Sequence, residues 1–182
     1  MTRFMATLLL LLPIFLGAAL PAHSQGQWTE YSPAGLGYRV QFPGAPKQSQ
    51  GTTQTSAGPL RVSVATLEAA GGVSYLASST VYPAAALYDD PQYALTKARS
   101  GGLRNVRGKL RVEERLMVSG APARRVIVDV PRRKQVYVGL FVLSGDRLYQ
   151  AMIGVPAGQE NAPEVNRFLG SLALTGSASV SR

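Results

Sequence analysis

One segment of the chain, residues 135–143, reads QVYVGLFVL. Because successive side chains of a strand point to opposite faces, a strand at this place is apolar on both faces. One face carries Val136, Val138, Leu140 and Val142, and the other carries Tyr137, Phe141 and Leu143. A strand with two apolar faces is buried between two layers, so the segment predicts a layered sandwich.

Further strand patterns lie on both sides of residues 135–143, and short turns separate them. The neighbouring strands are expected at 109–118, 123–130 and 147–155, and earlier ones at 28–32, 38–42, 60–67 and 73–82. Consecutive strands with short turns pair in antiparallel fashion. Residues 47–58 are rich in Gln, Ser, Thr and Gly and predict a loop or a mobile hairpin tip.

Two segments carry helix signals. Asp90 and Pro91 predict a helix start, which Gly101 and Gly102 are expected to stop or interrupt. Asn161 is the expected cap of a second helix, whose apolar face is formed by Val165, Phe168, Leu169 and Leu172. The sequence therefore predicts an α+β fold in which helices cover an antiparallel β-sheet.

The first residues have the pattern of an export signal. Arg3 precedes an apolar run from Leu8 to Leu20, and small residues at Ala22 and Ser24 match a signal-peptidase site. We expect a signal peptide at 1–24, cut after Ser24 or, as a second choice, after Ala22. The alternative is an uncleaved anchor, but about 13 apolar residues fall short of the ~20 needed to span a bilayer.

The rest of the chain predicts one exported domain. Residues 25–175 suffice for a single α+β core, and residues 176–182 predict a disordered tail. No further apolar run is long enough to span a membrane, so we expect a periplasmic or extracellular protein.

The composition removes most catalytic and metal-binding side chains. The chain has no cysteine, and its one histidine, His23, lies in the expected signal peptide. This excludes Ser-His-Asp and Cys-His catalysis and His/Cys metal sites from the domain. Carboxylates remain at 89–90 and 113–114, where calcium binding or acid–base catalysis competes with helix capping and ion pairing. We expect no cofactor and no enzymatic activity.

Positive charge is concentrated in one part of the chain. Lys97 to Lys134 contains twelve basic and three acidic residues, within a chain of net charge +9. The candidate anion- or partner-binding residues are Arg124, Arg125, Arg132, Arg133 and Lys134. They predict docking on an anionic surface or an envelope protein; a merely solvated surface is the alternative. Nucleic acid is not the expected partner, because export leads away from it and the segment lacks interleaved aromatics.

An alternative function is the carriage of a small ligand. Tyr137, Phe141 and Tyr149 fall on expected strands and are the candidate lining of an apolar, aromatic pocket between sheet and helix. Core packing is the other reading of these three rings.

Four segments together resemble small secreted bacterial proteins of the PsbP/Mog family. They are YRVQFPGAP at 38–46, GAPAR at 120–124, RLY at 147–149 and FLGSL at 168–172. The resemblance implies an antiparallel sheet sandwiched by helices and a role in binding or assembly. The metal-binding histidines of photosynthetic members have no counterpart here. We therefore expect an exported, non-enzymatic binding or assembly module.

Overall fold

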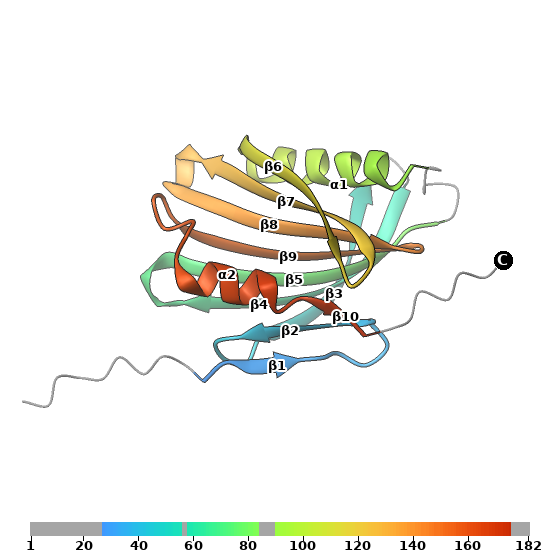
Figure 1. Cartoon of the computed structure of the whole chain (residues 1–182), viewed down its shortest axis with the longest axis horizontal. Coiled ribbons are helices and arrows are strands. Elements are labelled where there is room, and N and C mark those ends of the chain that lie inside the picture. The colour runs from blue at the N-terminus through green and yellow to red at the C-terminus, as the bar shows by residue number, and fades with distance from the viewer. Residues whose placement is uncertain (1–26, 56–57, 84–89, 176–182) are drawn as a thin grey trace, which may run out of the picture.

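A seven-stranded antiparallel sheet forms the middle layer of the molecule (Figure 1). The structure, a computed structural model, describes residues 27–55, 58–83 and 90–175. In spatial order the strands are β3-β4-β5-β9-β8-β7-β6. Their bounds are Lys47–Thr55 for β3, Gly58–Ala69 for β4, Val73–Val81 for β5, Lys109–Val118 for β6, Ala121–Val130 for β7, Gln135–Ser144 for β8 and Arg147–Pro156 for β9.

Strand β8 lies inside this sheet, between β7 and β9. Val138 and Val142 are fully buried on one of its faces, and Phe141 is buried on the other. The prediction that residues 135–143 form a strand covered on both sides is therefore confirmed. The chain reaches β8 indirectly: after β5 it passes through helix α1 (Pro91–Val106) to the edge strand β6 and returns through β7, β8 and β9.

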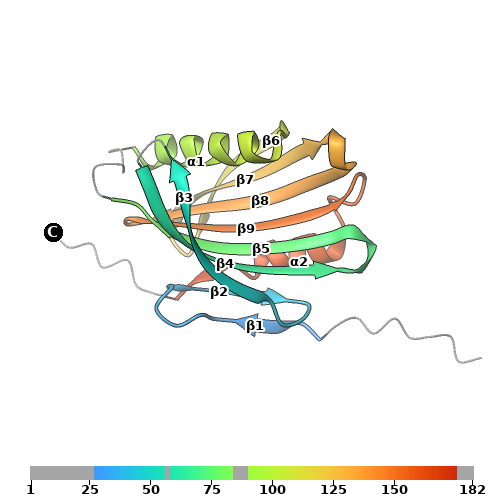
Figure 2. The same cartoon turned by 180° about the vertical axis from the view of Figure 1, so that it is seen from behind.

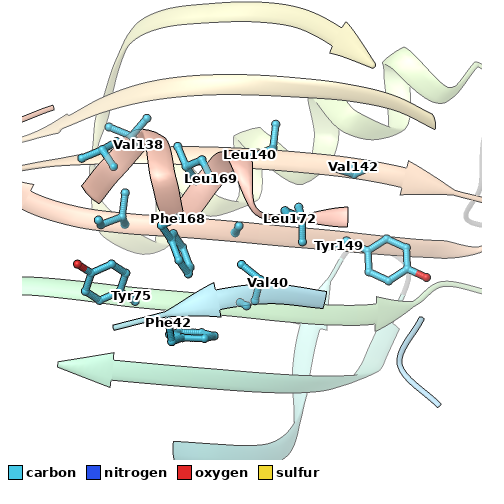
Figure 3. Close-up of a cluster of buried hydrophobic side chains, with 14 of the residues drawn as sticks. Val40, Phe42, Tyr75, Val138, Leu140, Val142, Tyr149, Phe168, Leu169 and Leu172 are labelled. Carbon is cyan, nitrogen blue, oxygen red and sulfur yellow. The ribbon is translucent and has the colours of Figure 1, made fainter. Parts of the chain in front are cut away.

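One face of the large sheet is covered by a helix and a small sheet. These elements are α2 (Pro163–Gly170) and the strands β1 (Thr29–Tyr31), β2 (Tyr38–Phe42) and β10 (Ala173–Leu174). Phe168 of α2 lies between layers, with its ring centroid 5.2 Å from that of Phe42 and 5.1 Å from that of Tyr75. Figure 3 shows these rings meeting where α2, the small sheet and the large sheet come together.

Helix α1 covers the opposite face, over β7 and β8 (Figure 2). As the sequence predicts, Asp90 caps the helix, because its side chain accepts a hydrogen bond of 2.8 Å from the backbone N–H of Gln92. Leu95 is fully buried and belongs to the same apolar cluster as Val128 and Phe141. The fold is thus a layered α+β sandwich, as expected. The described residues also include the short 3-10 turns η1 (Ala70–Gly72) and η3 (Pro131–Arg133).

The structure corrects the prediction that the whole of 47–58 is a loop or a mobile hairpin tip. Residues Lys47–Thr55 form the edge strand β3, which pairs with β4 from Lys47 opposite Thr66 to Thr55 opposite Gly58. An edge strand tolerates polar side chains because it has a neighbouring strand on one side only and is exposed to water on the other. The polar composition therefore marked an edge strand and not a loop.

Two helix boundaries also differ from expectation. Gly101 and Gly102 lie inside α1, which continues to Val106 and ends where Arg107 adopts a left-handed conformation. A Cβ at Gly102 would lie 3.8 Å from the ring of Phe141, so this part of the helix runs close to the sheet. Helix α2 begins at Pro163, its N-cap is Ala162, and Asn161 does not cap it.

Some expectations fall outside the described residues. The export signal at 1–24, the tail at 176–182 and the carboxyl group of Asp89 all lie in parts of the chain that the structure does not describe. Within the described ranges, no helix has the length and hydropathy needed to cross a membrane.

Replacing the central aromatic ring tests the core. We expect Phe168→Ala to lower the free energy of unfolding by about 3–5 kcal/mol, because it removes a fully buried ring between three elements. Urea unfolding followed by tryptophan fluorescence and circular dichroism measures this loss. Met117→Ala is the control, since Met117 is 63% exposed and its loss should change stability by less than about 0.5 kcal/mol. Equal effects of the two substitutions would contradict the assignment of Phe168 to the centre of the core.

Candidate functional site

Ten of the twelve basic residues between Lys97 and Lys134 fall into two groups in the structure. Four of them, Arg99, Arg111, Arg124 and Arg125, face carboxylates within the protein. A second group is exposed at one end of the sheet. The two groups differ in what they can do, because a cation already paired with a carboxylate has little charge left for a partner.

Arg124 belongs to the interior. Arg124 is only 5% exposed. Its guanidinium donates a hydrogen bond of 2.9 Å to the backbone carbonyl of Gln92 and forms a salt bridge with the carboxylate of Glu113. Arg99 of α1 donates to the same carboxylate at 3.3 Å. Arg124 therefore ties the first turn of α1 to the edge strand β6 and is not an available partner-binding residue.

Arg125 points to the other face of the sheet. It is adjacent to Arg124 in strand β7, and successive residues of a strand face opposite sides. Its guanidinium lies 3.9 Å from the carboxylate of Glu114. The structure therefore does not bring Arg124 and Arg125 together with residues 132–134, because five or more residues of extended strand separate them from the β7–β8 turn.

The second group, which we call the basic end, lies where α1 ends, β6 begins and β7 turns into β8 (Figure 1). Its members are exposed, and within the described part of the chain none of them makes a salt bridge. They are Arg104, Arg107, Lys109, Arg132, Arg133 and Lys134. The last three were predicted from the sequence as candidates, whereas the first three were counted only as part of the basic segment.

The backbone at Gly108 passes close to strand β7, and this brings residues 104–109 next to residues 132–134. Gly108 donates its N–H to the carbonyl of Leu103 at 3.0 Å, which closes the end of α1. A Cβ at position 108 would lie 2.3 Å from the side chain of Val128, so only glycine fits there. The next residue, Lys109, pairs across the sheet with Asp129, two residues before the η3 turn.

The η3 turn itself has a defined conformation. Lys134 adopts a left-handed backbone with φ of 53°, and its N–H donates to the carbonyl of Pro131 at 3.1 Å. Its own carbonyl accepts a hydrogen bond of 3.2 Å from Ala157. Arg133 donates to the hydroxyl of Tyr137 at 2.8 Å. The three cations therefore stand on a backbone that is held at several points.

The carboxylates nearest to the basic end are engaged by another cation. Arg111 pairs with both Asp129 and Glu160. The hydrogen bond from Arg111 holds the pKa of Asp129 below its usual value, with a smaller contribution from the charge of Lys109. A backbone hydrogen bond and then the bond from Arg111 lower the pKa of Glu160. Both groups are ionised at neutral pH, and Arg111 balances one of their two negative charges.

The three aromatic candidates do not form one pocket. Tyr137 and Phe141 lie on the face that packs under α1, whereas Tyr149 pairs with Val142 and lies on the face under α2 and the small sheet. The cavity that Phe141 lines has a volume of about 10 Å³, which is too small for an organic ligand. The rings of Phe141 and Tyr149 are core residues, and the predicted pocket is wrong. Across the described ranges, no group of three or more acidic, histidine or cysteine side chains is placed to hold a metal ion.

The fold is similar to that of cyanobacterial PsbP (CyanoP) from Synechocystis sp. PCC 6803, with a TM-score of 0.53 at 8% sequence identity. The similarity covers 87% of this chain and 98% of that protein. A protein of unknown function from Pseudomonas aeruginosa, PA94, aligns at a TM-score of 0.38 and 14% identity, over 74% of this chain and 87% of that one. Comparison with protein-family models and with curated proteins gives no match. The chain thus has a PsbP-like fold, which confirms the fold expected from the sequence.

Removing the carboxylate beside Arg124 tests its structural role. We expect Glu113→Gln to lower the free energy of unfolding at pH 7 by about 3 kcal/mol, because a buried guanidinium then lacks its counter-charge. Chemical unfolding of the variant and the wild type measures this. Glu114→Gln is the matched control, since its side chain is 59% exposed and its arginine lies 3.9 Å away. Equal losses in the two variants would contradict a structural role specific to Glu113.

The same carboxylate makes stability depend on pH. Burial acts to raise the pKa of Glu113, but the hydrogen bond from Arg124 and the charges of Arg99 and Arg124 outweigh it, so the pKa is lowered. A lowered pKa stabilises the fold above the unfolded-state value of about 4.3, and this contribution is lost as the pH falls further. Unfolding free energies measured between pH 7 and pH 3 should therefore decline less steeply in Glu113→Gln than in the wild type. Parallel curves would contradict the assignment.

Proposed function

We propose that this chain is an exported, non-enzymatic binding module whose basic end docks on an anionic partner of the cell envelope. The observation that carries the proposal is the basic end itself: six exposed cations from two separate segments, without a salt bridge in the described structure. Unpaired surface charge of one sign attracts the opposite sign over about 8–10 Å at physiological ionic strength. The interaction is therefore expected to weaken as salt rises.

Two further points support this reading. The cations lie on a backbone fixed by the α1 terminus and the η3 turn, so docking costs little ordering of the main chain. The resemblance noted in the sequence also implies binding or assembly and not catalysis. The competing idea of a carrier with an aromatic pocket loses its basis, because Tyr149 is separated from Tyr137 and Phe141 by the sheet.

The first test identifies the partner. The tagged protein is crosslinked in the native envelope and recovered at low and high salt, and the proteins and lipids that accompany it are identified. We expect a stoichiometric anionic partner at low salt that is lost at high salt. Recovery of the protein alone at both salt concentrations would contradict the proposal.

The second test asks whether the basic end makes the contact. We expect Arg132→Glu/Lys134→Glu to weaken binding of that partner about tenfold or more, since each cation near an anionic surface contributes on the order of 1 kcal/mol. Lys47→Glu/Arg115→Glu is the matched control, because it changes the net charge equally at two exposed residues away from the basic end. Binding to the partner is measured at several salt concentrations. An equal loss in both variants would show that only net charge matters, and no loss in either would exclude the basic end.

A further inference from the structure

A second feature lies away from the basic end, where β8 turns into β9. A cavity of about 340 Å³ opens there between the large sheet and the connection from β1 to β2. This volume is within the range of small-molecule sites, at its lower end. The lining side chains used below are Arg61, Arg147, Ser63, Ser79, Leu36 and Val81.

The strand register places the polar lining in two adjacent rows. Ser63 of β4 pairs with Ser79 of β5, and Ser79 pairs with Tyr149 of β9. In the next row on the same face, Val81 of β5 pairs with Arg147 of β9. Extending the β4–β5 register by one pair places Arg61 of β4 opposite Val81. Side chains two residues apart in a strand share a face. The two guanidinium groups therefore flank the cavity from β4 and β9, with the two hydroxyl groups behind them.

The charge of this cavity is positive and unbalanced. Its lining contains two arginines and no acidic residue. Arg147 donates one N–H to the carbonyl of Gly35 at 2.9 Å, and Arg61 has no hydrogen bond or salt bridge to any described residue. Most of the donors on both groups are thus free to bind. Guanidinium groups bind carboxylates and phosphates through paired N–H donors, which makes an oxyanion the matching ligand group.

A hydroxyl group on the cavity wall gives further support. Ser79 lies on an interior strand, and its hydroxyl makes no hydrogen bond to any residue that the structure describes; its oxygen is not sealed from solvent and opens on the cavity. Because Ser79 lines the cavity, a molecule held there can supply the missing partner. Leu36 and Val81 give the same cavity an apolar side.

We propose that this cavity binds a small ligand that carries an oxyanion group, a carboxylate or a phosphate, attached to a short apolar part. Arg61 and Arg147 bind the oxyanion, Ser63 and Ser79 donate hydrogen bonds to it, and Leu36 and Val81 contact the apolar part. This site is separate from the basic end and goes beyond the docking function proposed above.

Binding of simple probes tests the site. The purified protein is titrated with hexanoate, hexyl phosphate and 1-hexanol, up to about 10 mM, by calorimetry and by NMR shifts of the cavity residues. We expect saturable binding of at least one anion and none of the alcohol, which has the apolar part without the charge. Preference for hexanoate or for hexyl phosphate then assigns the oxyanion as carboxylate or phosphate.

Matched variants locate the binding. We expect Arg61→Gln to weaken the binding of the anion about tenfold or more, because it removes a charged hydrogen-bond donor that makes no hydrogen bond or salt bridge to a described residue. Ser79→Ala should weaken it less. Arg115→Gln, a change at an exposed arginine of β6, and Arg132→Glu/Lys134→Glu at the basic end should leave it unchanged. No saturation with either anion, or wild-type affinity in Arg61→Gln, would overturn the proposal.

Discussion

Both apolar faces of β8 must be removed from water, and the arrangement of the other elements follows from that requirement. Helix α1 covers the face of Phe141, while α2 and the small sheet cover the face of Val138 and Val142. The strand can be covered twice only if the chain crosses from one side of the sheet to the other. It does so through α1, which leads from β5 to the distant edge strand β6, so that β9 later returns to pair with β5.

The same crossing decides which cations are available to a partner. Laying α1 over β7 brings the first turn of the helix above Arg124, whose guanidinium is then buried and requires Glu113 and the carbonyl of Gln92. The end of α1, in contrast, leaves Arg107 and Lys109 exposed beside the η3 turn. A dense run of basic residues in a sequence is therefore a poor guide to surface charge, because the fold neutralises part of it internally.

Much of the fold could be predicted from local patterns. Alternation identified the central strands, and Asp90 with Pro91 located the start of α1, because these signals involve neighbouring residues. Strand β3 escaped prediction because its sequence, KQSQGTTQT, contains no apolar side chain that could reveal an alternating pattern. The predicted aromatic pocket failed for a different reason. The two-residue turn at Gly145 and Asp146 makes Ser144 face Arg147, which places Tyr149 beside Val142 and not beside Phe141. Following the alternation of faces from β8 through this turn into β9 would have placed Tyr149 on the opposite face from Tyr137 and Phe141. The cavity at Arg61 and Arg147, in contrast, depends on pairings between segments far apart in the sequence, so no local pattern indicates it.

The pairing of β5 with β9 has a consequence for the order in which the protein can form. Residues 73–81 cannot complete their sheet until residues 147–156 are present, and the face beneath Phe168 stays open until α2 and β10 follow. Contacts of such long sequence separation form slowly, because the entropy of closing the intervening loop must be overcome first. A chain made or transported from its N-terminus therefore holds two incomplete half-sheets until almost all of it has emerged. Completion of the fold is therefore controlled by β9, α2 and β10, so folding is coupled to the arrival of residues 147–174.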